Sequence, residues 1–95
     1  MKHCISAKFN ETVADKPAAL AQVRALFASA APVEGVNQMT IHEHCVARDN
    51  RYDLMIVVEM EKKALPNWDA SEIHHQWKDQ FGGMLAKKAI FDYED

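Results

Sequence analysis

The sequence is poor in the residues on which several common kinds of site depend. It has two cysteines and three glycines, with no CxxC pair, no glycine-rich phosphate loop and no nucleophile elbow. Eleven Lys and Arg stand against 14 Asp and Glu, a net charge of -3. Nucleic-acid phosphates are bound by clustered lysine and arginine, whereas Lys62-Lys63 and Lys87-Lys88 are no more than pairs. We expect no nucleic-acid partner and no cofactor.

Long hydrophobic runs are missing as well. The Ala/Leu-rich residues 18–33 are interrupted by Gln22 and Arg24, and a membrane-spanning helix needs about 20 predominantly apolar residues in a row. The opening MKHCISAKF has neither the apolar core nor the small-residue cleavage site of a signal peptide. We therefore expect a cytoplasmic protein without a membrane partner.

What the sequence does contain is a globular composition with periodic apolar residues. A chain of 95 residues with 48% hydrophobic residues predicts one domain, residues 1–95. Periodicity predicts six elements: strands at 2–9, 36–46, 51–60 and 88–94, a helix that begins after Asp15 and closes before Pro32 and Gly35, and a helix capped by Asp69 with Glu72 and ended by Gly82-Gly83. The unbroken apolar run from Leu54 to Val58 predicts burial on both faces of its strand.

The order β-α-β-β-α-β predicts an α+β, ferredoxin-like fold with a four-stranded antiparallel sheet. Right-handed crossovers put both helices on one face, with the strands at 2–9 and 51–60 in the centre. Cys4 and Cys45 would then lie on strands separated by a third, roughly 10 Å apart and beyond disulfide reach. We expect both to be free thiols.

In such a fold one face of the sheet has no helix over it. Alternation assigns five apolar residues to this face: Met55, Val57, Ala89, Phe91 and Tyr93. A contiguous apolar patch of that size is unusual on a monomer. We predict that a second copy covers it, sheet against sheet, in a homodimer; a monomer with an exposed patch is the alternative.

Several segments resemble a known family. They are KHCISAKF, RYDLMIVVEME, Leu65-Pro-Asn-Trp68 with His74 and Trp77 after it, and AIFDYED. Together they are similar to the stress-responsive dimeric α/β barrel (Dabb) family, which includes olivetolic acid cyclase. The resemblance covers essentially the whole chain. The resemblance implies a homodimer formed through the open sheet face. The cyclase itself catalyses an aldol condensation without a cofactor.

The stretch WDASEIHHQW places two histidines on the second predicted helix. At 100° per residue, His74 lies about 60° from the centre of the apolar stripe and His75 about 160° from it. His74 therefore borders the core, while His75 faces water. A packed, hydrogen-bonded histidine at the edge of the core is the structural interpretation of His74; a general base is the functional one.

The resemblance adds a possible site to this reasoning. The family's pocket tyrosine, His-Pro pair and catalytic histidine correspond to Trp68, Ser71-Glu72 and His74, and His3 matches a histidine on the first strand. Two positions depart from the pattern, because Trp68 replaces the tyrosine and Leu54 replaces a pocket histidine. The aldol mechanism therefore does not carry over. We predict an apolar pocket with His3 and His74 as its polar groups, walled by Trp68, Trp77, Leu54, Ile56, Phe27 and Ile90. Asp92 is interpreted as structural.

His42-Glu43-His44 is a candidate metal site. Two imidazoles at i and i+2 on one strand face could chelate, but no third ligand is evident, so no metal is expected. Two functions from different classes remain. One is a binder of a small hydrophobic or aromatic molecule, with possible acid/base chemistry at His74 and His3; the other is a non-catalytic dimeric stress-response module.

Overall fold

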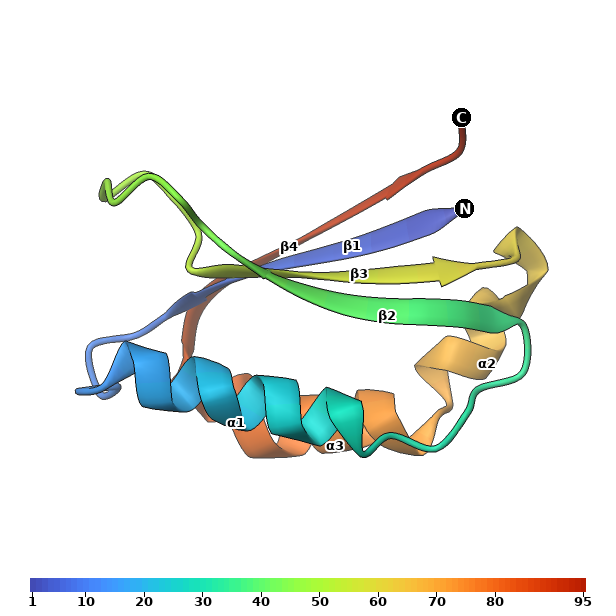
Figure 1. The fold of residues 1–95 in the computed structure, drawn as a ribbon, viewed down its shortest axis with the longest axis horizontal. Coiled ribbons are helices and arrows are strands. Elements are labelled where there is room, and N and C mark those ends of the chain that lie inside the picture. Colours follow the sequence, from blue (N-terminus) through green and yellow to red (C-terminus); the bar gives the residue numbers. More distant parts are fainter.

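The computed structural model describes residues 1–95 as a four-stranded antiparallel sheet with helices along one side (Figure 1). The strands are β1 (Lys2–Phe9), β2 (Val36–Glu43), β3 (Leu54–Met60) and β4 (Leu85–Tyr93). Their order in the sheet is β2-β3-β1-β4, so the predicted pair of strands is central. The α+β, ferredoxin-like fold is confirmed.

The end of β2 and the start of β3 differ from the prediction. β2 stops at Glu43 and β3 starts at Leu54, so residues 44–53 form a loop that rises on the side of the sheet away from the helices (Figure 1). Asp53 explains where β3 begins: its carboxylate accepts the Phe9 N–H at 2.8 Å, and its own N–H donates to the Ala7 carbonyl at 2.9 Å. The fourth strand starts earlier than predicted, at Leu85, because it pairs with β1 as far as Phe9.

The first helix begins as predicted and the second does not. In α1 (Lys16–Ala28) the Asp15 carboxylate accepts the Ala18 N–H at 3.0 Å. α3 (Glu72–Phe81) is capped by Ser71, whose hydroxyl oxygen accepts the His74 N–H at 3.2 Å, so the prediction of Asp69 as the cap was wrong. Asp69 instead ends α2 (Leu65–Asp69), a short helix that the sequence analysis did not predict.

Pro66 lies in the first turn of α2. A proline is tolerated in the first turn of a helix, where its missing N–H has no intrahelical partner to lose, and α2 uses it there. Single 3₁₀ turns flank the two C-terminal helices, η1 (Lys62–Ala64) before α2 and η2 (Gly82–Met84) after α3. Gly82 ends α3, as predicted. No helix is long and apolar enough to cross a membrane.

The core lies between the sheet and the helices. On β3, Leu54, Ile56, Val58 and Met60 point into it and are at most 2% exposed. The intervening Met55 is 39% exposed and Val57 is only partly buried, so within one chain the run is buried on one face, not two. Apolar positions on the second face thus have no cover from their own chain.

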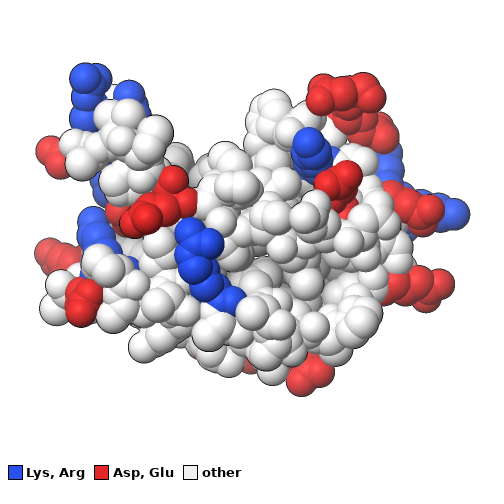
Figure 2. All heavy atoms as spheres, viewed as in Figure 1, with Lys and Arg blue, Asp and Glu red and all other residues white.

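The open face of the sheet carries the predicted patch. Cross-strand register places Met55 and Ala89 beside Ser6, and Val57 and Phe91 beside Cys4. Phe91 is 69% exposed, and Figure 2 shows mostly uncharged surface in the hollow between loop 44–53 and the C-terminal end. The middle of this face is hollowed and carries the apolar patch.

Both cysteines are free thiols, as predicted, with Cys4 buried and Cys45 exposed. Cys4 lies between Val57 and Phe91 on the open face. Its burial raises the pKa of the thiol; the nearby charge of Asp92 raises it further, and Lys2 opposes the shift.

Candidate functional site

A groove of about 370 Å³ lies between α3 and β4, on the helix side of the sheet. Its lining brings together one face of β4, one side of α3 and the first residues of β1; it consists of His3, Ile5, Leu65, Asp69, His74, Trp77, Lys78, Lys88, Ile90 and Asp92. Antiparallel pairing sets His3 opposite Asp92 and Ile5 opposite Ile90. Because β4 is the edge strand, its inward face is not fully covered by α3, and Ile90 stays 49% exposed on the groove floor.

His3 is the polar group at the closed side of this groove. Its side chain is only 8% exposed, and its Nδ1 contacts Oδ1 of Asp92, which comes from the last strand. A carboxylate only accepts hydrogen bonds, so the hydrogen resides on Nδ1. In the neutral ring, Nε2 then keeps a free lone pair.

His74 is held in the same way by a different oxygen. Its Nδ1 lies 2.9 Å from the backbone carbonyl oxygen of Asp69, and a carbonyl also only accepts. The ring therefore donates through Nδ1 and leaves Nε2 as its acceptor. His74 is partly buried and its neighbour His75 is exposed, in agreement with the helical geometry.

Trp68 connects the two histidines. Its ring centroid lies 6.2 Å from that of His3 and 5.2 Å from that of His74. The indole is fully buried, and its Nε1 has no hydrogen-bond partner in the protein. A buried donor without an acceptor costs about 1–3 kcal/mol, so the unpaired indole N–H lowers the free energy of unfolding.

The structure brings together only part of the predicted pocket. His3, His74, Trp77 and Ile90 line the groove, and Trp68 packs behind the two histidines. The three other predicted wall residues belong to the hydrophobic core instead: Phe27, Leu54 and Ile56. Leu54 and Ile56 face the helices from β3 and Phe27 lies on α1, but the packing of helices on the sheet fills the space between them with side chains.

Asp92, interpreted from the sequence as structural, is the partner of His3. Alternation on the last strand puts it on the same face as Ile90, and pairing with β1 puts it opposite His3. Combining the predicted topology with strand register would have found this pair. Lys78 and Lys88 were missed as well; they lie at the groove and make no ion pair.

The two histidines weighed as metal ligands have separate surroundings. His42 Nε2 lies 2.9 Å from the Thr40 hydroxyl oxygen, whereas His44 lies past the end of β2, with Nε2 4.0 Å from Asp53. The shared strand face on which the pair was weighed therefore does not exist. No group of three or more His, Cys, Asp or Glu side chains is arranged to hold a metal ion.

No protein-family model and no curated protein sequence matches the chain, but solved structures resemble it. A dimeric protein of unknown function with a ferredoxin-like fold from Bacteroides fragilis has a TM-score of 0.81 at 12% identity, over 99% of this chain and 94% of that chain. A dabb family protein from Mesorhizobium loti has a TM-score of 0.71 at 10% identity, over 99% and 94%. For a hydroxynitrile lyase from Passiflora edulis the values are 0.71 and 7%, over 97% and 89%. This chain thus has the fold of dimeric ferredoxin-like proteins, and the family that it resembles in sequence is represented among its structural neighbours.

Proposed function

We propose that the protein is a cytoplasmic homodimer, joined through the open sheet face, that binds a small hydrophobic or aromatic molecule in the groove between α3 and β4. His74 and His3 serve as its proton acceptors or hydrogen-bond anchors. The dimer is supported by the exposed apolar patch around Phe91 and by the dimeric state of a structural neighbour.

One observation carries the binding proposal. Two imidazoles line one groove, and each has its Nδ1 hydrogen directed to an oxygen acceptor, Asp92 for His3 and the Asp69 carbonyl for His74. When either ring is neutral, this contact fixes its tautomer and leaves the Nε2 lone pair as the acceptor. A histidine so oriented is suited to general-base catalysis, because no tautomer change has to precede proton transfer.

The groove also limits the kind of ligand. Trp77 and Ile90 supply apolar contact, and Lys78 and Lys88 supply positive charge without an acidic partner. An aromatic ring or short alkyl chain that carries a carboxylate or phenolic oxygen matches this combination.

A non-catalytic dimer is the second candidate, and the packing of the core favours it. Sixteen buried residues fill the space between sheet and helices, so the groove is confined to the edge of the sheet. In that case the stable dimer itself would be the selected property, and no small molecule would bind the groove.

A thermal-shift screen with phenols and small aromatic acids separates these functions. A ligand that binds only the folded protein at 100 times its Kd stabilises it by about 2.7 kcal/mol, which raises the melting temperature of a domain of this size by roughly 10 °C or more. We expect such a shift for the unaltered protein and a much smaller one for His74→Ala.

The adjacent residue supplies the control. His75→Ala removes an exposed imidazole one position away and should leave both the ligand shift and the stability unchanged. His74→Ala itself should cost less than about 1 kcal/mol in the absence of ligand, because the side chain lies at the rim of the core. Absence of any shift across the screen would favour the non-catalytic dimer.

A further inference from the structure

A second hollow region lies at the other end of the sheet, where loop 44–53 stands over the ends of β1 and β4. It consists of two adjoining hollows of about 270 and 230 Å³ that share Lys8, Asp49 and Arg51. Lys8 is five residues from His3 along β1, roughly 16 Å at 3.3 Å per residue. This basic cleft is defined here by Lys8, Arg48, Arg51 and Lys87.

The cleft holds two like charges that face one another and make no ion pair. Lys8 on β1 and Lys87 on β4 are directly opposite one another in the antiparallel register, so both side chains point to the same face of the sheet. Like charges at such positions repel. Arg51 from the loop lines the same hollow and adds a third positive charge.

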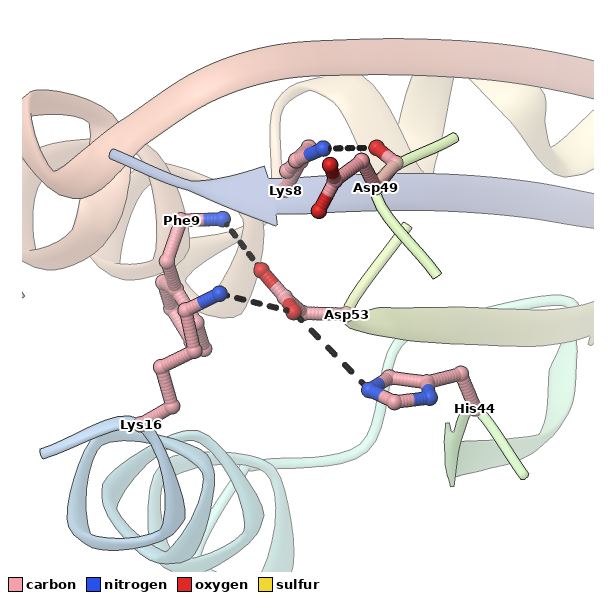
Figure 3. A network of polar contacts seen from close by, with 6 residues as sticks. All are labelled: Lys8, Phe9, Lys16, His44, Asp49 and Asp53. Atoms are coloured by element: carbon pink, nitrogen blue, oxygen red, sulfur yellow. Dashed lines mark hydrogen bonds and ion pairs between the residues drawn. The ribbon is translucent and has the colours of Figure 1, made fainter. Parts of the chain in front are cut away.

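The surrounding polar contacts hold the cleft in place (Figure 3). The Asp53 carboxylate, only 12% exposed, accepts the Phe9 N–H and is paired with Lys16 at 3.4 Å and with His44 at 4.0 Å. The ammonium group of Lys8 donates to the backbone carbonyl of Asp49. These contacts fix the loop against β1 and α1, so the cations are carried on an anchored framework.

The cations of the cleft have no acidic partner of their own. The ion pairs of the chain involve other basic groups, namely His3, Lys16, His44, Lys62 and Lys63. The Arg51 side chain donates only to the neutral amide of Asn50, at 2.7 Å, and the Lys8 ammonium group only to a backbone carbonyl. Asp49 is the one acidic residue in the cleft that makes no ion pair. A chain with net charge -3 thus concentrates unpaired positive charge at one point.

We propose that the basic cleft binds a small multivalent oxyanion, such as a phosphate or diphosphate group. Lys8 and Lys87 would both contact the anion, and its attraction for each ammonium group would offset the repulsion between them. Arg48 and Arg51 would contact it through guanidinium groups, whose planar fork matches two oxygens of a phosphate. Lys8 and Lys87 lie on the face of the sheet opposite to the His3 and His74 groove. The cleft does not depend on the function proposed for that groove.

Titration with sodium pyrophosphate at constant ionic strength tests this proposal. Amide NMR signals around Lys8, Lys87 and loop 44–53 should shift in a saturable manner, and the melting temperature should rise with ligand concentration. Arg48→Gln with Arg51→Gln should weaken the affinity at least tenfold. Inorganic phosphate, with less charge, should bind more weakly at the same residues.

Lys62→Gln with Lys63→Gln is the matched control, since it removes the same charge from exposed positions at the opposite end of the sheet. It should change the affinity less than twofold. Chemical shifts that grow linearly without saturation, or an equal loss of pyrophosphate affinity in both double variants, would show nonspecific electrostatic attraction and would refute the proposed site. Sedimentation provides a further check. If Arg48→Gln with Arg51→Gln dissociates the dimer without any added anion, the cations serve acidic groups of the second copy and the proposal is wrong.

Discussion

Phe91 offers the sharpest test of the proposed dimer. It leaves 69% of its surface exposed in one chain. An aromatic side chain buries roughly 200 Å², so a second copy would remove roughly 140 Å² per chain from water, about 3.5 kcal/mol at about 25 cal/mol per Å². A dimer contains two such residues, so complete coverage contributes about 7 kcal/mol. Half of that would still change the dimer Kd roughly 300-fold.

Phe91→Asp should therefore convert the dimer to monomer at micromolar concentration, measured by sedimentation velocity over a dilution series. Ile90→Asp is the matched control: it lies on the same strand and is 49% exposed, but on the opposite face of the sheet. That variant should remain dimeric. The dimer proposal fails if the unaltered chain sediments as a monomer at these concentrations, or if Phe91→Asp has no larger effect than Ile90→Asp.

Three further predictions concern stability and reactivity. Gly35→Ala should lower the free energy of unfolding by about 2 kcal/mol or more in a urea titration, because φ is +84° and an added Cβ would meet a neighbouring side chain; Gly83→Ala, with open space around it, should be nearly neutral. Ser71→Ala should cost about 1 kcal/mol in the same assay through loss of the helix cap, and no loss would argue against that cap. At pH 8 a thiol reagent should label Cys45 quickly and Cys4 only after unfolding, because Cys4 is buried and its burial raises the pKa of the thiol; two equally fast labelling phases would contradict this prediction. Since the thiol ionises at lower pH in the unfolded chain than in the folded one, Cys4 should lower the free energy of unfolding as the pH rises above about 8.5.

The fold could be predicted because its signals are local and repeated. Alternation along β1 and the helical stripe of Ile73, Trp77 and Phe81 each determine an element from its own residues, and the order of elements leaves few topologies. Element ends were less predictable. The cap on Ser71 and the start of β3 at Leu54 both depend on side-chain hydrogen bonds, for which several neighbouring residues were equally good candidates.

The groove was only partly predictable, for a different reason. Facing the helices is a property of one strand, and it correctly places His3 and Ile90 on the inner side of the sheet. Whether that position borders a groove or the filled core depends on how far α3 extends over the edge strand, which no single segment encodes. Leu54 and Ile56 satisfy the same alternation, yet they lie on a central strand and are fully packed.

Lys87 and Lys88 show how the same alternation separates the two proposed sites. In the sequence they form one basic pair, too small a cluster to bind nucleic acid. On β4 their side chains point to opposite faces, because successive residues of a strand alternate. Lys88 lines the groove with His3 and His74, while Lys87 opposes Lys8 in the basic cleft. The two lysines therefore belong to different sites, and each site is completed by residues distant in the chain. Charge clusters on strands therefore have to be counted by face and by cross-strand neighbour, and on that count the open face of this acidic protein has a basic end.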